Sequence, residues 1–300
     1  MSGFRLTRRR ALGLAVAGAV AALLKPLRGH GAERVQVRRG YGKGRFGQLH
    51  YRIAKPATGA AQPPLLCLHS SPNSGRIYET FLGAMGTDRI AVAADTPGFG
   101  DSDPPPAVPA IADYAAAMGD LIDAMGFETV DLIGYHTGSL TSVELALQRP
   151  DQVRRVIMIA APVFTEAELT EHRAHFAPVE LTRDGSHLAE AWAEHVYWAM
   201  PGWTLDHVAT QFPDAIRRPD ISWWGHNAAF NYVLADKLPK VRQPTLVLNP
   251  EDDLHEQTLR AQSLIANGRM HELPGWGHGF LDIHTNKAAT IVRDFLAAGG

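Results

Sequence analysis

A histidine stands where a predicted strand turns sharply into a predicted helix. The strand pattern ends at Gly134, the turn runs to Gly138, and apolar residues at helical spacing continue to Leu147. Glycines on both sides of the turn let the helix pack back against the strand, because no Cβ fits between the two. The apex is His136, and histidine tolerates the positive φ of such an apex better than most residues do. Its imidazole, with an ordinary pKa of about 6.5, can act as a nucleophile or transfer protons at neutral pH.

This turn resembles the nucleophile elbow of the α/β-hydrolase superfamily, Gly-x-Ser-x-Gly, with histidine in the place of the nucleophilic serine. Four other loops resemble loops of the superfamily and follow its order along the chain. They are His69–Gly75, similar to the His-Gly-x-Pro oxyanion loop; Asp95–Asp103, similar to Asp-x-x-Gly-x-Gly-x-Ser; Pro250–Leu254, similar to the acid turn; and Pro274–Gly279, similar to the histidine loop. The resemblance covers residues 34–298. It implies an α/β-hydrolase fold, which is a mostly parallel, doubly wound sheet with an inserted helical cap.

The resemblance also implies a role for one residue in each loop of the site. Asp253 takes the place of the acid that orients the catalytic histidine, and His278 takes the place of that histidine, the general base. The backbone N–H groups of Ser71 and Thr137 take the places of the two oxyanion donors. His136 takes the place of the attacking residue. The implied catalytic residues are therefore His136, Asp253 and His278.

Two enzymatic routes are open to these residues. In the first, neutral His136 attacks a carbonyl carbon, and water then hydrolyses the acyl-imidazole. In the second, His278 backed by Asp253 activates a water molecule, while His136 polarises or protonates the substrate. An imidazole is larger than a hydroxymethyl group and fills space beside the oxyanion hole, which favours the second route. The nearest hydroxyls, those of Thr137 and Ser139, lie off the apex and are weaker candidates for a nucleophile.

Three other interpretations stay open. The chain could bind a ligand without chemistry, it could catalyse a lyase or proton-transfer reaction, or His136, His278 and a carboxylate could hold a metal ion. Retention of Asp253 and His278 favours an enzyme, because a buried Asp–His pair has little structural use. In a triad Asp253 engages the far nitrogen of His278, so we expect no metal and no other cofactor. The prediction is a hydrolase that acts on an ester, lactone or related carbonyl bond of a small molecule.

Strand and helix patterns alternate along most of the chain, as in a parallel sheet with helices on both faces. Residues 34–39 and 48–53 alternate polar and apolar positions and predict an antiparallel hairpin. Further strands are predicted at 64–70, 89–93, 155–160, 243–249 and 269–273, and helices at 76–85, 111–125 and 283–297.

The alternation breaks between residues 163 and 240. Only helical patterns recur there, at 166–176, 187–200, 205–212 and 221–238. The domain prediction is therefore a core of residues 33–162 and 241–300 with a helical cap of residues 163–240. The cap holds five of the six tryptophans. Most of them are expected to pack the cap onto the core, while Trp223, Trp224 and His226 are candidate contacts for a largely apolar substrate.

The N-terminus has the pattern of an export signal. Arg8 and Arg9 precede an uncharged apolar stretch, residues 11–24, which is too short to span a bilayer comfortably. The segment Thr7–Leu12 resembles the bacterial twin-arginine signal, and cleavage near residue 32 is expected to give a periplasmic or secreted protein, tethered to the membrane if uncleaved. Removal of residues 1–32 leaves 23 basic against 31 acidic residues, so we expect no nucleic-acid partner. The sequence leaves the oligomeric state open.

Overall fold

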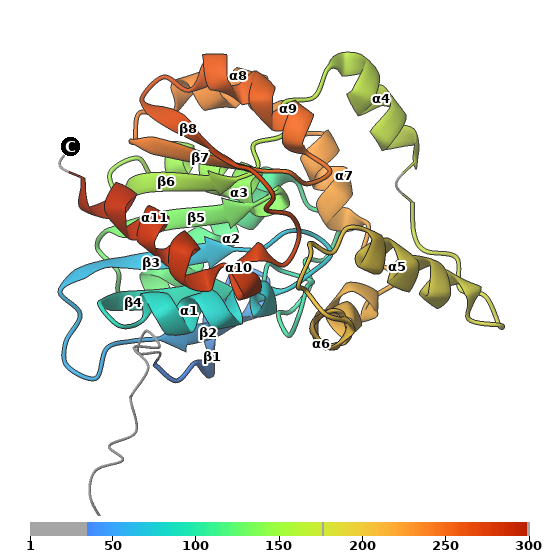
Figure 1. The fold of residues 1–300 in the computed structure, drawn as a ribbon, viewed down its shortest axis with the longest axis horizontal. Coiled ribbons are helices and arrows are strands. Elements are labelled where there is room, and N and C mark those ends of the chain that lie inside the picture. Colours follow the sequence, from blue (N-terminus) through green and yellow to red (C-terminus); the bar gives the residue numbers. More distant parts are fainter. Residues whose placement is uncertain (1–34, 176, 299–300) are drawn as a thin grey trace, which may run out of the picture. The chain divides into compact units, whose positions relative to one another are not determined.

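The computed structural model describes residues 35–175 and 177–298, which lie in one compact unit, Ala32–Gly300. Within these residues the centre is an eight-stranded sheet with the strand order β1-β2-β4-β3-β5-β6-β7-β8 (Figure 1). Neighbours from β4 to β8 run parallel, whereas β1 pairs with β2 and β2 with β4 in antiparallel fashion. The strands are β1 (Arg38–Gly44), β2 (Gly47–Ala54), β3 (Gln62–Leu68), β4 (Arg89–Ala94), β5 (Val130–Tyr135), β6 (Val153–Ile159), β7 (Thr245–Pro250) and β8 (Gly268–Leu273). The predicted α/β-hydrolase fold is confirmed.

The central strands are buried along their whole length and mostly apolar, because helices cover both faces of the sheet. All six residues of β5 are buried, as are all six of β7. One face is covered by α1 (Glu79–Met85), α10 (Phe280–Ile283) and α11 (Thr285–Ala297), and the other by α2 (Ile111–Ala124) and α3 (Thr137–Gln148). Each face therefore has its own apolar core, and both cores continue to the strand ends that carry the site.

A run of helices joins β6 to β7. These helices are α4 (Glu166–His175), α5 (Ser186–Tyr197), α6 (Leu205–Ile216), α7 (Trp224–Phe230) and α8 (Leu234–Lys237). Figure 1 shows α4, α5 and α6 beyond the ends of the central strands, at the right of the view. In contrast, α7 and α8 pack Ala228, Ala229 and Leu234 into the core on the α3 side of the sheet. The inserted segment therefore has an outer part and a part that belongs to the core.

Two elements differ from the sequence prediction. The hairpin strands extend beyond the predicted ranges to a tight turn at residues 45 and 46. Gly40 and Gly44 belong to the first strand, where the absence of a Cβ leaves room for the side chains of Tyr51 and Leu49 on the second strand. The predicted helix at 221–238 is broken into α7 and α8. Asn231 ends α7 and its amide donates to the carbonyl of Asn227, a local bond that competes with helix continuation.

The predicted export signal lies outside the described residues. Among the residues that the structure describes, none of the helices has the length and apolar character needed to cross a bilayer.

Candidate active site

The turn between β5 and α3 places His136 at its apex with φ 49° and ψ −111°. The turn is tight: a Cβ on Gly134 would lie 2.1 Å from the carbonyl oxygen of Gly138, and a Cβ on Gly138 would lie 2.0 Å from that of Leu68. Both glycines are therefore required by close approach of the backbone, as the sequence pattern indicated. The turn aims the imidazole at the carboxyl edge of the sheet, where ligands of open parallel sheets bind.

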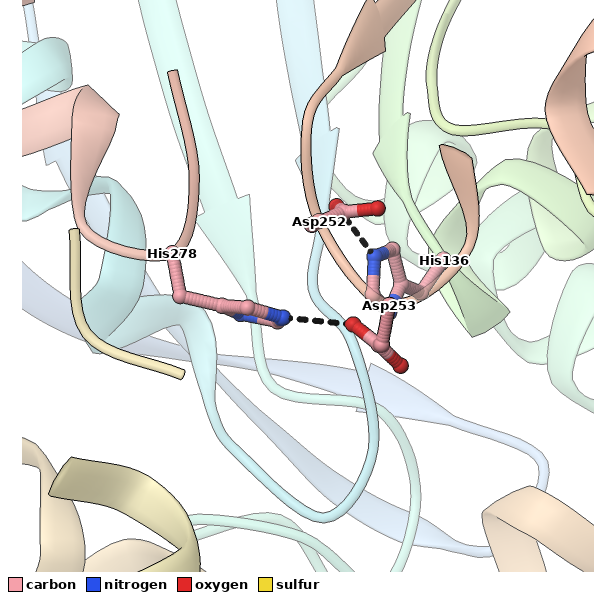
Figure 2. Close-up of side chains that lie close together, drawn as sticks. All are labelled: His136, Asp252, Asp253 and His278. Atoms are coloured by element: carbon pink, nitrogen blue, oxygen red, sulfur yellow. Dashed lines mark hydrogen bonds and ion pairs between the residues drawn. The ribbon is translucent and has the colours of Figure 1, made fainter. Parts of the chain in front are cut away.

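Two more loops bring side chains to the same edge. Asp253 follows β7 and His278 follows β8, the neighbouring strand. Nε2 of His278 lies 2.7 Å from Oδ1 of Asp253, and both side chains are about one third exposed (28% and 36%). The three residues predicted from the sequence therefore meet, with the rings of His136 and His278 5.3 Å apart between centroids (Figure 2).

A fourth residue, Asp252, was missed by the sequence reasoning. Its Oδ2 lies 2.9 Å from Nε2 of His136 (Figure 2). Its side chain is fully buried, and its Oδ1 accepts the backbone N–H of Leu254 at 2.9 Å. The signal was present, because two aspartates stand side by side after β7. Counting along the acid turn selected Asp253 alone, whereas the loop sends each carboxylate to a different histidine.

The two acids change the protonation of the site. Burial by itself lowers the pKa of His136, but the charge of Asp252, its hydrogen bond and the charge of Asp253 outweigh burial and raise that pKa above its ordinary 6.5. Burial by itself raises the pKa of Asp253, yet the charge of His136 and the hydrogen bond and charge of His278 hold it below its ordinary 3.8. His136 therefore keeps a proton more readily than free imidazole does, and Asp253 stays ionised.

Tyr135 fixes the orientation of both rings. It is the last residue of β5 and is 4% exposed. Its ring meets that of His136 edge to face at 4.6 Å and stacks on that of His278 at 5.9 Å. Such packing holds each imidazole in one orientation.

The cluster opens into a cavity of about 470 Å³. Its lining residues include Ser71 and Thr137, the two predicted oxyanion donors. The structure records no hydrogen bond from the backbone N–H of either residue to the part of the chain that it describes. Trp223 and His226 line the cavity, as the sequence predicted, whereas Trp224 is not among the lining residues. The other aromatic side chains of the wall are Tyr135, Phe164, Trp198, Trp203 and Phe230.

Several histidines line the cavity. His172, His187, His195 and His226 line it together with the two histidines of the cluster. Burial, the charge of His136 and that of His172 lower the pKa of His226 to about 4, against the opposing effect of Asp253. His226 is therefore neutral at pH 7 and can accept or donate a hydrogen bond.

A model of the alpha/beta hydrolase fold matches residues 63–285. The chain belongs to the alpha/beta hydrolase fold family. It is 27% identical to a 2-hydroxy-6-oxo-2,4-heptadienoate hydrolase of Pseudomonas putida, covering 80% of this chain and 91% of that protein, and 24% identical to a fluoroacetate dehalogenase of Burkholderia sp, covering 80% and 88%. Its fold is similar to that of an enol-lactonase from Burkholderia xenovorans, with a TM-score of 0.71 at 18% identity over 86% of this chain and 100% of that one. The chain is a hydrolase, as these relatives are.

The hydroxyl of Ser139 is not available as a nucleophile in this α/β hydrolase. Ser139 is fully buried, and its Oγ lies 3.0 Å from the carbonyl oxygen of Gly134 and 3.1 Å from that of Ile159. The first contact is within the strand–turn–helix unit that forms the apex, and the second joins α3 to the end of β6. The hydroxyl therefore supports the turn.

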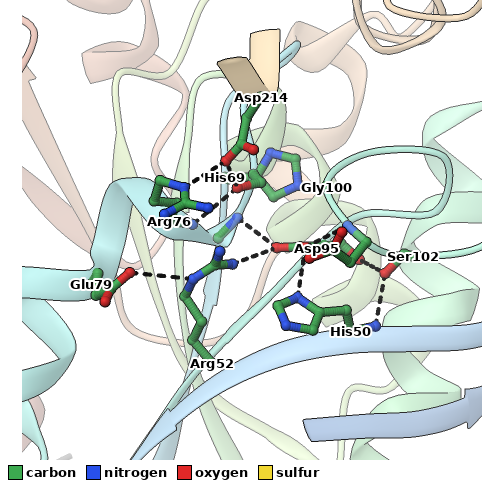
Figure 3. A network of polar contacts seen from close by, with 12 residues as sticks. His50, Arg52, His69, Arg76, Glu79, Asp95, Gly100, Ser102 and Asp214 are labelled. Carbon is green, nitrogen blue, oxygen red and sulfur yellow. Dashed lines mark hydrogen bonds and ion pairs between the residues drawn. The ribbon is translucent and has the colours of Figure 1, made fainter. Parts of the chain in front are cut away.

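A buried polar network supports the loop that follows β3, the predicted oxyanion loop (Figure 3). Asp95 binds Nδ1 of His50 at 2.7 Å and the guanidinium of Arg52 at 3.2 Å, and it accepts the backbone N–H of Gly75 at 2.8 Å. Next to it, Oγ of Ser74 donates to Asp214 of α6 at 2.6 Å. This network holds the end of the loop that carries Ser71, and the bond from Ser74 to Asp214 joins that loop to the inserted helices.

Proposed function

We propose that this hydrolase cleaves an ester, lactone or related carbonyl bond of a small, largely apolar substrate by direct attack of water. His136 stands where members of the family carry their nucleophile. The observation that carries the proposal is that the apex side chain is itself paired with a buried acid, through Nε2 of His136 and Oδ2 of Asp252 at 2.9 Å. An imidazole that holds its proton is a poor nucleophile and a good acid.

In this mechanism the two Asp–His pairs have different roles. His278 takes a proton from water, and Asp253 stabilises the imidazolium that forms. The resulting hydroxide adds to the carbonyl carbon, and the backbone N–H groups of Ser71 and Thr137 stabilise the oxyanion. His136 donates its proton to the leaving group as the tetrahedral intermediate collapses. The proton held by His278 then returns to His136 through solvent, so the cycle adds one water across the broken bond.

The cavity supports the substrate class. A volume of about 470 Å³ fits a small molecule, and most of its wall is apolar or aromatic. Among the described residues, no lysine or arginine lines it. The names of the similar proteins point the same way, since one hydrolyses an oxo-heptadienoate and another is an enol-lactonase. Trp223 and His226 are proposed to contact the substrate.

The test is a screen of the full chain against short aryl esters and lactones. We expect turnover that resists serine-directed phosphonylating reagents, because the apex has no serine and Ser139 is buried. His278→Gln should lower kcat on the order of 10²-fold or more, since it removes the base. Glu251→Gln is the matched control: this carboxylate lies on the same loop as Asp253 but binds the backbone N–H of Gly275, and its loss should leave kcat within about twofold.

Two results would count against this mechanism. Phosphonylation of a serine with loss of activity would identify an ordinary serine nucleophile. Ligand binding in the cavity with no turnover of any ester or lactone would favour the non-catalytic interpretation instead.

A further inference from the structure

We propose that His136, Asp252, Asp253 and His278 also form a binding site for one divalent transition-metal ion such as Zn²⁺ or Co²⁺, and that the bound ion switches hydrolysis off. The binding site rests on the geometry of the four side chains alone. The effect on hydrolysis rests on the proposed function, in which His278 is the base.

The four side chains are close enough to share one ion. Each offers a ligand atom, and these atoms lie within 4.8 Å of one another. Ligand atoms around tetrahedral zinc lie about 2.0–2.2 Å from the metal and therefore about 3.3 Å apart. The two hydrogen-bonded pairs, at 2.9 and 2.7 Å, need to open by about half an ångström, and the widest separation needs to close by up to about 1.5 Å. Rotations of the four side chains suffice for such changes.

The types of ligand and their charges suit a divalent ion. Imidazole nitrogen suits zinc and cobalt, and carboxylate oxygen completes many zinc sites. Two carboxylates and two neutral imidazoles together balance the charge of the ion. Each carboxylate is paired with a histidine, and the structure records no ion pair of either with a lysine or arginine in the part of the chain that it describes.

The position of Asp253 differs from the one on which the expectation of no metal was based. That expectation placed the carboxylate of Asp253 on the far nitrogen of His278, away from the apex. In the structure Asp253 binds Nε2 of His278, and Figure 2 shows its carboxylate between the two imidazole rings. The supports of a metal site are also present: the backbone N–H of Leu254 orients Asp252, and the ring of Tyr135 packs on both imidazoles.

The second group of metal-ligand side chains, His50, Asp95 and Asp101, is a weaker candidate. The carboxylate of Asp95 is already occupied by Arg52 and by backbone N–H groups. A permanent cation takes the place that an ion would need.

An ion held by all four side chains is expected to inhibit. Four protein ligands fill a tetrahedral coordination sphere, whereas catalytic zinc sites keep one position open for water. Ligation also takes Nε2 of His278 away from Asp253, the carboxylate that stabilises the imidazolium in the proposed mechanism, and the charge of the ion opposes protonation of the ring. The metal-bound form therefore lacks both a position for water and an effective base.

The binding test is a Co²⁺ titration of the full chain, without a histidine tag and after treatment with a chelator. We expect the visible absorption band of tetrahedral Co²⁺ to saturate at one equivalent. Asp252→Asn, which keeps side-chain shape, and His136→Asn, which tolerates the positive φ of the turn, should each weaken binding at least tenfold and keep the fold as judged by circular dichroism. The matched control is Asp282→Asn, whose carboxylate also lines the cavity but binds the indole N–H of Trp203, and it should bind Co²⁺ as the wild type does.

The activity test adds Zn²⁺ to the wild type during ester hydrolysis. One equivalent should abolish turnover, and a chelator should restore it. Absence of the Co²⁺ band, or a band that survives both cluster variants, would overturn the binding site. Binding that leaves turnover unchanged or raises it would overturn the inhibition. If the protein hydrolyses none of the esters, the proposed function fails, but the Co²⁺ titration still decides the metal site.

Discussion

His136 is held at both ends, by its backbone and by its ring. A residue at positive φ costs on the order of 1–3 kcal/mol, and such strain persists where the surroundings over-determine the conformation. Here the close approach of Gly138 to β3 supplies that constraint. At the other end Asp252, with a fully buried side chain, holds Nε2. Removal of one partner of such a pair would leave a buried charge uncompensated.

The two Asp–His pairs differ in exposure, and this difference supports the roles proposed for them. The side chains of His136 and Asp252 are 13% and 0% exposed, whereas those of His278 and Asp253 are 28% and 36% exposed. The buried pair keeps its proton, and the exposed pair can meet water from the cavity.

At the scale of elements, the inserted helices do not form one unit. Helices α4, α5 and α6 contribute much of the cavity wall, yet of residues 166–216 only Met200 belongs to the buried cores of the sheet. Helices α7 and α8 and the turn after them add Ala228, Ala229, Leu234 and Leu238 to the core. We propose that the boundary between cap and core falls near residue 217. In that division, part of the predicted cap, residues 163–240, belongs to the core.

Two deletions test this boundary. Replacement of residues 166–216 by a flexible linker should give an inactive chain that still unfolds cooperatively, because the sheet and its cores are nearly complete without them. A longer deletion, residues 166–238, also removes Leu234 and Leu238 and should cost roughly a further 3 kcal/mol or more. Thermal and urea unfolding of the two chains measure the difference. Equal stability would mean that α7 and α8 are part of a separable cap.

Much of the fold could be predicted from the sequence because its signals are local. Continuous apolar runs identified the buried strands, and the order of four loops identified the family. The predicted ends of an element were wrong where the residues at that end have no side-chain pattern of their own. Gly40 and Gly44 carry no alternation of their own, and their place in β1 depends on Tyr51 and Leu49 across the hairpin.

The candidate site was predictable in part for a similar reason. His136, Asp253 and His278 came from motifs, and the structure brings them together. The partner of His136 could not be found in this way, because it depends on where two adjacent carboxylates point after β7. Trp224 shows the same limit: its neighbour Trp223 faces the cavity, and a helical pattern alone does not fix which of the two does so.

At the scale of the whole molecule, we propose that residues 1–32 direct export and that the mature hydrolase works outside the cytoplasm. The support is the sequence pattern alone, a pair of arginines before an apolar stretch. Residues 1–40 fused to a reporter should give a periplasmic signal in bacteria, and Arg8→Lys with Arg9→Lys should abolish it. The same fusion with Arg38→Lys and Arg39→Lys is the control. Unchanged export of the fusion with Arg8→Lys and Arg9→Lys would contradict a twin-arginine signal.

The cavity joins parts of the chain far apart in the sequence. Asp214 of α6 binds Ser74 and the guanidinium of Arg76 in the loop after β3, so the outer helices are fastened to the oxyanion loop (Figure 3). The Asp–His cluster comes from the turns after β5, β7 and β8. Hydrolysis in the proposed mechanism depends on the whole assembly, and its most specific requirement is that His136 acts as an acid.

The most direct measurement compares the wild type with His136→Asn on two esters that share an acyl group, one with a 4-nitrophenyl and one with an ethyl leaving group. Asparagine also tolerates positive φ, so the turn should survive. Nitrophenoxide leaves without a proton, whereas ethoxide needs one. If His136 is the acid, kcat/KM should fall on the order of 10²-fold more for the ethyl ester than for the nitrophenyl ester. The control His226→Asn should lower both values alike. Equal losses on the two esters in His136→Asn would contradict the acid role and support His136 as the nucleophile.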